Sequence, residues 1–486
     1  MHPIIDNGKS DYQILTPGVS MFPSPEAYAA REIRDALFEM TGVRLPIRGA
    51  VQRVPGRPAI RVGEEPWPDT GSPWNQRPLD GKWKSVWEKD WYEISRDGRD
   101  LVLRGNPGRG TLYAAYAFLE SLGVRFYGPG EIRIPSSPRV ELPVEPRRGT
   151  AAFALRQVHY AEAIRPEWAL RWGLNVHAGR DARWAGRSPI RGLGHSFGSL
   201  VPPSRWFDEH PEYFSLVEGR RKDYAWQLCC THPDVAEIAC EGVARMIEAN
   251  PHAHIFPVGH NDGLAEFCEC DRCAEVDRRE GSQAGQLLTL VNRVAERFPD
   301  KVICTLAYTY SADPPRHMRA RDNVLIVLCH DSGCFTHSLD GCEPNATMLR
   351  RLDGWRKAAE HVLIWDYFTN FHSYLLPAPN FRRIGRDIAR YRDAGVVGMF
   401  CQGATCPGGQ FAGPRMYLLS RLTWDPDADA MGIVSDWVRG VYGDAAGRHV
   451  LDYIEMLEEH VWNNNVHVGS FGEGCEVLSD IFTDDI

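Results

Sequence analysis

The first 150 residues combine short apolar stretches with helical periodicity. Between residues 25 and 41, apolar side chains recur every three or four positions, with Pro25 near the start and Gly42 after the end, which predicts a helix. Residues 110–122 repeat this pattern and are followed by Gly123. The remaining apolar stretches predict strands at residues 43–47, 59–62, 91–95 and 100–104. We therefore expect a small α/β domain at the N-terminus.

A proline-rich stretch, IPSSPRVELPVEPRRG at residues 134–149, separates this pattern from the rest of the chain and predicts a linker. We place the domain boundary there, with residues 1–148 as an accessory domain and residues 149–486 as the second domain. Beyond the boundary, strands alternate with helices. Strands are expected at residues 154–160, 174–177, 227–231, 254–260, 302–308, 324–330, 362–366 and 397–402. Amphipathic helices are expected at residues 234–249, 284–298, 346–360, 380–393 and 415–422.

Eight strands alternating with helices over roughly 280 residues match the size of a (β/α)8 barrel. Several strands, such as VLIVLC and HVLIW, are almost continuously apolar, as buried parallel strands are. An open doubly wound sheet is the alternative, but no glycine-rich phosphate loop follows any strand. The predicted fold class is α/β, with a TIM-type barrel after a small α/β domain. Because the sequence stops just after a helix-like run, we expect the natural chain to continue past Ile486.

Composition narrows the functional classes. The 486 residues include 55 Lys and Arg and 64 Asp and Glu, so the net charge is −9, and no basic run offsets it. Such a chain is a poor partner for nucleic acid or an anionic membrane. An apolar fraction of 43% argues against disorder, and no stretch of roughly 18 apolar residues predicts a spanning helix. The first residues lack a secretory pattern, so we expect a cytoplasmic protein, or an exported one whose leader is absent from this sequence.

Polar side chains gather where the apolar strands end, which is where the catalytic residues of a barrel lie. Three strands end in an aspartate, and these are the candidate catalytic residues: Asp262, Asp331 and Asp366. The candidate substrate-binding residues are Tyr160, His260, Asn261, Tyr308, His330, Trp365, Tyr367, Asn370 and Gln402. One aspartate at a strand end is most often a helix cap or an ion-pair partner. Three of them beside aromatic and amide side chains favour a carbohydrate pocket.

Carboxylates in such a pocket support glycoside hydrolysis. One protonated carboxyl protonates the leaving oxygen, and a second carboxylate acts as nucleophile, activates water or orients an acetamido group of the substrate. We expect all three aspartates to open onto one cavity. Asp366 ends the most apolar strand, so we expect desolvation to raise its pKa and Asp366 to matter most. The alternative is that Asp366 pairs with an arginine such as Arg156 and braces the barrel mouth.

The motif CECDRC contains three cysteines with metal-ligand spacing. Cys270 and Cys273 have the C-x2-C spacing that places two thiolates on one metal, and Cys268 is a candidate third ligand. The fourth ligand is open among Cys229, Cys230, His232 and Cys304. A structural zinc, a local disulfide and free thiols all remain open, and no cofactor is expected to be required for catalysis. The pairs Cys334/Cys342 and Cys401/Cys406 are too isolated in the sequence to predict metal sites.

Several of these motifs resemble known families. GNPGRGTLYAAYAFLESLGVRFYGPGE at residues 105–131 resembles the N-terminal accessory domain of α-glucuronidases and related glycosidases. From HPEYFSL through GHNDG, CECDRC, LVNRVAERFPDK, LAYTY, LCHDSGC, LIWDYFTNFHSYLLPAPNF and LTWDP, the chain resembles the bacterial family named domain of unknown function 4838. Some members of that family are endo-β-N-acetylglucosaminidases of glycoside hydrolase family 163. The resemblance implies a catalytic (β/α)8 barrel and retaining cleavage assisted by the substrate's own acetamido group.

Two positions depart from the usual pattern of that family. Cys401 stands where a glutamate commonly precedes the Gln-Gly pair, and Asp331-Ser332 stands where the strand-six loop commonly carries a glutamate. If those glutamates form the catalytic pair, the activity of this chain is altered, is shifted to the three aspartates, or is absent.

Three functions follow from these observations. The leading hypothesis is a glycosidase acting on a glycan that contains N-acetylhexosamine, or alternatively a uronate. The second is a carbohydrate-binding barrel with lost or altered catalysis. The third is a metal-dependent enzyme built on Cys268, Cys270 and Cys273. The expected partner is an oligosaccharide or glycan substrate; neither nucleic acid nor a membrane is expected, and the oligomeric state is not predicted.

Overall fold

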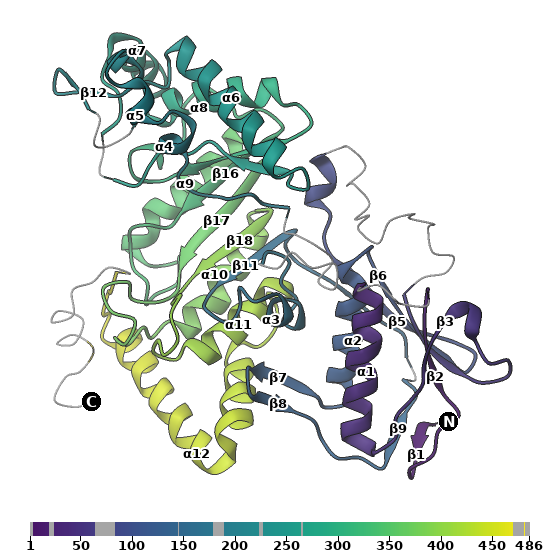
Figure 1. The fold of residues 1–486 in the computed structure, drawn as a ribbon. Helices are drawn as coiled ribbons and strands as arrows, with labels where there is room; N and C mark the ends of the chain where they lie inside the picture. The colour runs from purple at the N-terminus through teal and green to yellow at the C-terminus, as the bar shows by residue number, and fades with distance from the viewer. Residues whose placement is uncertain are drawn as a thin grey trace. The chain divides into compact units, whose positions relative to one another are not determined.

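The computed structural model describes residues 3–18, 24–63, 83–143, 145–177, 189–222, 227–263, 266–469 and 481 (Figure 1). Contacts within the chain divide it into two compact units. The first unit consists of Met1–Asp80, Glu88–Ser188 and Phe411–Tyr453, and the second of Gly81–Trp87, Pro189–Gln410 and Ile454–Ile486. The predicted boundary at residue 148 lies inside the stretch Glu88–Ser188 of the first unit, and the division into an accessory domain and a barrel stays a prediction.

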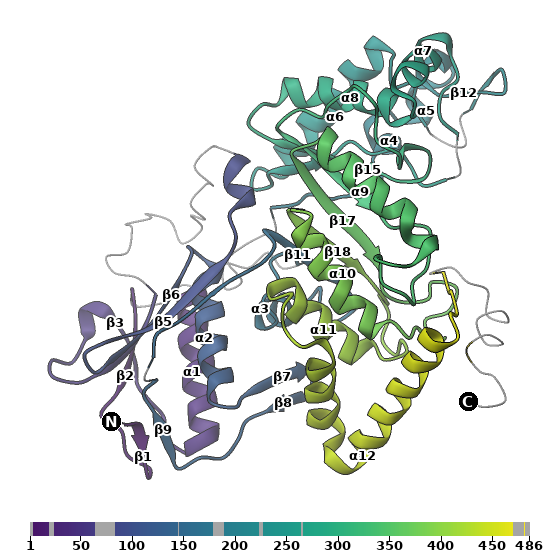
Figure 2. The same ribbon diagram turned by 180° about the vertical axis from the view of Figure 1, so that it is seen from behind.

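The first unit is built around a six-stranded mixed sheet with strand order β10-β5-β6-β4-β2-β3. The strands of the first unit, inside and outside this sheet, are β1 (Pro3–Asp6), β2 (Gln13–Thr16), β3 (Ile47–Gly49), β4 (Ala59–Val62), β5 (Trp91–Asp97), β6 (Asp100–Gly105), β7 (Arg125–Gly128), β8 (Glu131–Arg133), β9 (Arg139–Glu141), β10 (Arg147–Thr150) and β11 (Leu155–His159). Its helices are α1 (Pro25–Thr41), α2 (Arg109–Ser121), α3 (Pro166–Arg171), α11 (Ala412–Trp424) and the first part of α12 (Ala430–Asn463). Helices α1 and α2 lie side by side against this sheet (Figures 1 and 2).

Helix α1 shows how local sequence signals set an element. The side chain of Ser24 caps the helix by accepting a hydrogen bond from the backbone N–H of Ala27 at 3.2 Å, and Pro25 occupies the first turn. Gly42 ends the helix with a φ of 76°, a left-handed conformation that glycine adopts without a steric cost. The helix predicted at residues 25–41 is therefore confirmed at both ends.

The proline-rich stretch carries more structure than a linker would. Strand β9 pairs antiparallel with β1, and strand β10 pairs antiparallel with β5 at the edge of the large sheet. Edge strands tolerate nearby prolines because one side of such a strand has no ladder to complete. The stretch thus contributes two strands to the sheets of the N-terminal region.

The second unit is built around five parallel strands in the order β18-β17-β16-β15-β14, which form a curled sheet (Figure 1). The strands of this unit are β12 (Leu216–Val217), β13 (Arg220–Arg221), β14 (Ile255–Pro257), β15 (Val302–Ala307), β16 (Val324–Cys329), β17 (His361–Tyr367) and β18 (Gly398–Gln402). Its helices are α4 (Phe197–Leu200), α5 (Pro203–Trp206), α6 (Pro233–Ala249), α7 (Asp271–Glu280), α8 (Ala284–Arg297), α9 (Ala346–Ala358), α10 (Phe381–Asp393) and the end of α12. No described helix is long and apolar enough to cross a membrane.

The strands expected at residues 174–177 and 227–231 are absent from the described structure as regular strands. In the first segment, the side-chain Oδ1 of Asn175 accepts the backbone N–H of Arg156 at 2.9 Å and so replaces a strand carbonyl. In the second, Leu228 forms only an isolated bridge with Phe214. The mixed α/β class and the curled parallel sheet are confirmed, while closure into a full (β/α)8 barrel stays a prediction.

Candidate functional site

The strand register sorts the predicted site residues onto two faces of the parallel sheet. Successive residues of a strand point to opposite faces, and directly paired residues point to the same face. Cys329 pairs with Trp365, and Tyr367 pairs with Gln402, so these four residues share one face, which we name the mouth face. Asp366 pairs with Cys401, and both therefore occupy the opposite face, toward the helices.

Two of the three aspartates approach Tyr308 at the carboxyl edge of the sheet. The Tyr308 hydroxyl donates a hydrogen bond to Oδ1 of Asp262 at 3.3 Å, and the backbone N–H of Thr309 donates to Oδ2 of Asp331 at 3.2 Å. Arg351 Nη1 lies 3.7 Å from Asp331 Oδ1. Burial, together with the charges of Asp262 and Asp331, raises the pKa of Tyr308, so this phenol stays protonated and donates hydrogen bonds.

Tyr367 belongs to the same group. It lies on the mouth face opposite Gln402. Burial raises the pKa of Tyr367, and the Cys329 thiol, Tyr308, Asp331 and Asp262 raise it further. Asp331 is only 16% exposed at its side chain, whereas Asp262 is exposed to solvent. The structure thus brings together two carboxyls of different burial and two protonated phenols.

Histidines form one wall beside Tyr308. His260 is fully buried, its ring lies parallel to Tyr308 with centroids 6.0 Å apart, and burial lowers its pKa to about 4, so it is neutral. His195 Nδ1 donates to the backbone carbonyl of His260 at 2.6 Å, and its ring centroid lies 6.1 Å from that of Tyr308. His195 was missed by sequence reasoning because it follows no expected strand. Asn261 holds the local loop, since its Oδ1 accepts the Gly198 N–H at 3.2 Å.

Trp365 and Gln402 form a second part of the mouth face. The indole Nε1 donates to Oε1 of Gln402 at 2.5 Å, and the indole packs against Phe400 with ring centroids 4.2 Å apart. This hydrogen bond holds the indole in one orientation, as a flat surface of the kind that binds sugar rings. Tyr160 is buried in the first unit, whereas the other predicted site residues belong to the second unit.

Asp366 differs from what the sequence predicted. Its carboxylate is fully buried and accepts hydrogen bonds from Arg383 Nη2 at 2.7 and 2.8 Å and from the Tyr391 hydroxyl at 3.0 Å. His330 Nδ1 lies 3.2 Å away. Burial alone would raise the pKa of Asp366, but Arg383 and His330 outweigh it and hold the pKa far below its ordinary value. The expected raised pKa is therefore wrong, because the strand alternation that places Trp365 and Tyr367 on the mouth face turns Asp366 toward helix α10.

The arginine that braces Asp366 is Arg383 and not Arg156. Arg383 is also paired with Asp387 Oδ2 at 2.7 Å, one helical turn along α10, and Tyr391 follows one turn later. Arg156 instead pairs with Asp90 at 2.6 Å in the first unit. The sequence held a signal for this network, since Arg383, Asp387 and Tyr391 recur every four residues on the buried face of α10.

Cys401 lies on the helix face with Asp366, and burial raises its thiol pKa well above the ordinary value. The side chain that departs from the expected family glutamate thus points away from the mouth face in this chain. Its thiol stays protonated and is no nucleophile.

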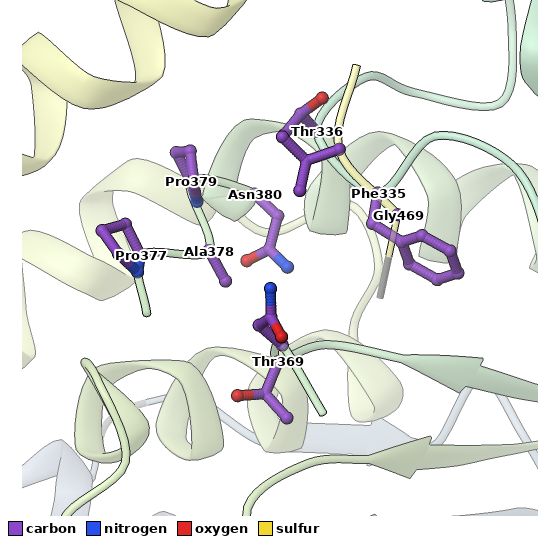
Figure 3. Close-up of a pocket in the computed structure, with 10 residues that line it drawn as sticks. Phe335, Thr336, Thr369, Pro377, Ala378, Pro379, Asn380 and Gly469 are labelled. Atoms are coloured by element: carbon purple, nitrogen blue, oxygen red, sulfur yellow. The ribbon is translucent and has the colours of Figure 1, made fainter. Parts of the chain in front are cut away.

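A small pocket that opens to solvent lies between the loops that follow β16 and β17. Figure 3 shows Thr336 and Phe335 on one wall, Pro377, Ala378 and Pro379 on another, and the Asn380 amide between them. Asn370 is the predicted site residue that lines it, and Asn370 Oδ1 accepts the His372 N–H at 2.8 Å. None of the three aspartates lines the pocket, so the expectation that all three open onto one cavity is not met by it.

Four cysteines cluster next to the short hairpin β12–β13. The sulfur atoms of Cys229, Cys268, Cys270 and Cys273 all lie within 4.8 Å of one another, and we name them the four-cysteine cluster. Cys229 Sγ lies 3.5 Å from Cys270 Sγ and 3.9 Å from Cys273 Sγ. The expected approach of Cys270 and Cys273 is confirmed, and the structure supplies Cys229 as the fourth member. The backbone N–H of Leu216 and Nη1 of Arg221 donate to Cys268 Sγ at 3.4 and 3.7 Å.

Comparison with known protein families shows which family this chain belongs to. Residues 126–455, more than half of the chain, match the model described as "Domain of unknown function (DUF4838)". The chain belongs to the DUF4838 family. No curated protein matches this DUF4838 chain.

Several solved structures of glycoside hydrolases are similar to this DUF4838 chain. A family GH115 4-O-methyl-α-glucuronidase with specificity for decorated arabinogalactans is similar with a TM-score of 0.56 at 12% identity, covering 93% of this chain and 62% of that one. The N-acetyl-β-hexosaminidase of Streptomyces plicatus, in complex with Thio-NAglucal, has a TM-score of 0.48 at 12% identity, covering 93% and 94%. A family 89 glycoside hydrolase of Clostridium perfringens, in complex with GlcNAc-α-1,4-galactose, has a TM-score of 0.47 at 10% identity, covering 79% and 49%.

Proposed function

We propose that this DUF4838 protein is a glycoside hydrolase. The observation that carries the proposal is the convergence of Asp262, Asp331, Tyr308 and Tyr367 at the carboxyl edge of the parallel sheet. Two carboxyls of unequal environment are what glycosidic cleavage needs, because one must donate a proton while the other stays ionised. The fold shared with a GH115 glucuronidase supports the proposal.

The environments of the two aspartates assign their roles. Asp331 accepts a backbone N–H and faces Arg351, which fixes its carboxylate in one orientation, so we assign it the role of orienting the substrate. We assign Asp262 the role of proton donor to the leaving oxygen, because its exposed carboxyl can exchange a proton with solvent between turnovers. His260 is buried and neutral, and it positions Tyr308 rather than transferring the proton.

The substrate that fits this set is a glycan with an N-acetylhexosamine at the cleaved bond. An acetamido group presents one N–H donor and one carbonyl acceptor. Asp331 would accept from the N–H, and the protonated phenol of Tyr308 or Tyr367 would donate to the carbonyl. This orientation aims the acetamido oxygen at the anomeric carbon and leads to retaining, substrate-assisted cleavage. Trp365, held by Gln402, supplies a flat surface for a sugar ring.

Replacing either carboxyl is expected to lower turnover by roughly 10²–10⁴-fold, the range of general acid–base catalysis. The substrates to be tested are glycans with a terminal or internal N-acetylhexosamine and, for comparison, glycans that contain a uronate. Asp331→Asn should lose activity on every substrate. Asp262→Asn should retain much more activity on an aryl glycoside, because a good leaving group needs little protonation. Product release measured by chromatography gives both rates.

Asp322→Asn is the matched control. Asp322 is exposed near the opposite end of strand β16, so this variant should keep wild-type turnover. Full activity in both Asp262→Asn and Asp331→Asn would exclude the proposed pair. Glycan binding by calorimetry without turnover in the wild type would assign the carbohydrate-binding function instead. If the protein hydrolyses only uronate-containing glycans, it is still a glycosidase, but Asp331 does not orient a substrate acetamido group.

We also propose that the four-cysteine cluster binds a structural zinc ion. Zn–S bonds of about 2.3 Å in a tetrahedron place sulfur atoms roughly 3.8 Å apart, close to the observed 3.5 and 3.9 Å. The hydrogen bonds from Leu216 and Arg221 to Cys268 stabilise a thiolate. Four protein ligands leave no open position for substrate, which argues against the metal-dependent enzyme built on these cysteines.

Cys273→Ser is expected to carry one zinc equivalent less than the wild type and to melt at a lower temperature, because three ligands hold zinc more weakly than four. Zinc is measured by plasma mass spectrometry after purification with reductant. Cys406→Ser is the control, since Cys406 is exposed and outside the cluster. Equal zinc content in Cys273→Ser and the wild type would contradict the proposal, and a thiol count that rises on reduction would indicate a disulfide.

A further inference from the structure

A second group of metal-ligating side chains combines three residues of the loop between β16 and α9 with one residue after α12. The group consists of Cys334, His337, Cys342 and His467, and we name it the Cys2His2 cluster. The spacing of residues in the sequence does not predict this cluster, because His467 is 125 residues from Cys342. The two cysteines that the sequence marked as isolated are thus completed by two histidines that only the fold brings close.

The donor atoms of the Cys2His2 cluster have the spacing of a tetrahedral site. Cys334 Sγ lies 3.2 Å from His337 Nδ1, Cys342 Sγ lies 3.7 Å from His467 Nδ1, and all four donor atoms lie within 4.8 Å of one another. Zn–S bonds of about 2.3 Å and Zn–N bonds of about 2.0 Å place tetrahedral ligand atoms roughly 3.3–3.8 Å apart. Two thiols and two imidazoles are the ligand set of many structural zinc sites.

The loop that carries three of these ligands is held in place by buried groups. Asn345 is fully buried, accepts the Cys334 N–H at 2.8 Å and donates to the carbonyls of Cys334 and His337 at 3.1 and 3.2 Å. The backbone N–H of His337 points at Cys334 Sγ at 3.3 Å, as backbone amides do around zinc-bound thiolates. The ligands are therefore preorganised before any ion binds.

The position of His467 is held by hydrogen bonds on both sides of it. The Thr336 hydroxyl donates to the carbonyl of Val466 at 2.7 Å, and the Phe335 N–H donates to the carbonyl of Val468 at 2.8 Å. These two hydrogen bonds hold the segment after α12 alongside the loop that carries the other three ligands. The imidazole of His467 is exposed at the surface, so the segment closes over the two buried thiols.

We propose that the Cys2His2 cluster binds a second structural zinc ion, which fastens the segment after α12 to the loop between β16 and α9. This loop contains Asp331 and also supplies Phe335 and Thr336 to the pocket in Figure 3, while the fastened segment supplies Val468 and Gly469. The ion would thus set the shape of one pocket wall next to the carboxyl edge of the sheet. Because all four positions are filled by protein, the ion is structural and takes no substrate.

Zinc stoichiometry and the ligand shell test this proposal independently of any activity. The full-length wild type, reconstituted with zinc under reductant, is expected to hold two equivalents, one in each cluster. His467→Gln should lose one equivalent while keeping the four-cysteine site, and because His467 is exposed, the variant should fold as the wild type does. Cys273→Ser should lose the other equivalent. X-ray absorption of Cys273→Ser should then show zinc with two sulfur and two nitrogen neighbours.

A second measurement follows the fastening itself. In His467→Gln, the backbone amide of Phe335 should exchange hydrogen faster than in the wild type, because its acceptor Val468 is no longer anchored. Cys406→Ser should match the wild type in zinc content and in exchange. Unchanged zinc content in His467→Gln would overturn the proposal, as would a pure sulfur shell in wild-type protein with two equivalents. Metal-free protein in which Cys334 and Cys342 resist alkylation until reduced would overturn it in favour of a disulfide.

Discussion

Asp366→Asn is expected to lower the free energy of unfolding by about 3–5 kcal/mol, the cost of removing one partner from a buried ion pair. The change leaves the Arg383 guanidinium fully buried with only Asp387 opposite it. Asp387 still contacts Arg383 Nε at 2.7 Å, but the guanidinium loses the second carboxylate, which its Nη2 contacts in the wild type. Chemical unfolding followed by circular dichroism measures the loss.

Asp340→Asn is the matched control for Asp366→Asn. Asp340 pairs with Arg390 of the same helix α10, but its side chain is 67% exposed, so its loss should cost under about 1 kcal/mol. Equal stabilities for Asp366→Asn and the wild type would show that the buried network is dispensable. Loss of turnover with full stability would instead return Asp366 to a role in the reaction.

Asp90→Asn is expected to destabilise the first unit by a similar amount, about 3–5 kcal/mol. Asp90 is buried and accepts hydrogen bonds from Arg156 Nη2 at 2.6 Å, from Asn106 Nδ2 at 2.8 Å and from Asn175 Nδ2 at 3.0 Å. Burial raises the pKa of Asp90, but Arg109 and Arg156 outweigh it and lower the pKa to about 2. The neutral asparagine leaves two arginines without their buried counter-ion.

The depressed pKa of Asp90 also gives a pH dependence. The unfolded chain binds a proton at this carboxyl near its ordinary value of 3.8, and the folded chain binds it only near 2. The contribution of Asp90 is complete above about pH 4 and is lost as the pH falls toward 2. The wild type should therefore lose more stability across this window than Asp90→Asn. Glu93→Gln, in the half-exposed pair with Arg104 on the next strand, is the control and should keep the wild-type slope. Parallel slopes for all three proteins would contradict the assignment.

The elements that sequence alone predicted are those whose signals are local. Helix α1 could be placed to the residue because Ser24, Pro25 and Gly42 act within one turn of its ends. Strands β16 and β17 could be placed because a buried parallel strand needs an apolar side chain at nearly every position. The same logic located the aspartates at strand ends, and it identified Cys268, Cys270 and Cys273 by their spacing.

The sequence could not decide which strand-end side chain faces the mouth. Asp331 and Asp366 look alike along the chain, since both follow apolar strands. A shift of one residue in register turns every side chain of a strand to the other face, and the register depends on neighbouring strands. Pairing of Asp366 with Cys401, and of Tyr367 with Gln402, settles that Asp366 faces α10 while Tyr367 faces the mouth.

The sequence by itself thus determined the α/β class, most helices, the parallel strands and the chemistry gathered at their ends. Tertiary structure alone decided that Asp366 is a buried brace, that Cys229 joins the three cysteines of CECDRC, and that His467 meets Cys342. The physical reason is the range of the interactions. Caps and periodicity act over a few residues, whereas an ion pair or a ligand cluster depends on where the packing of strands and helices brings distant segments together.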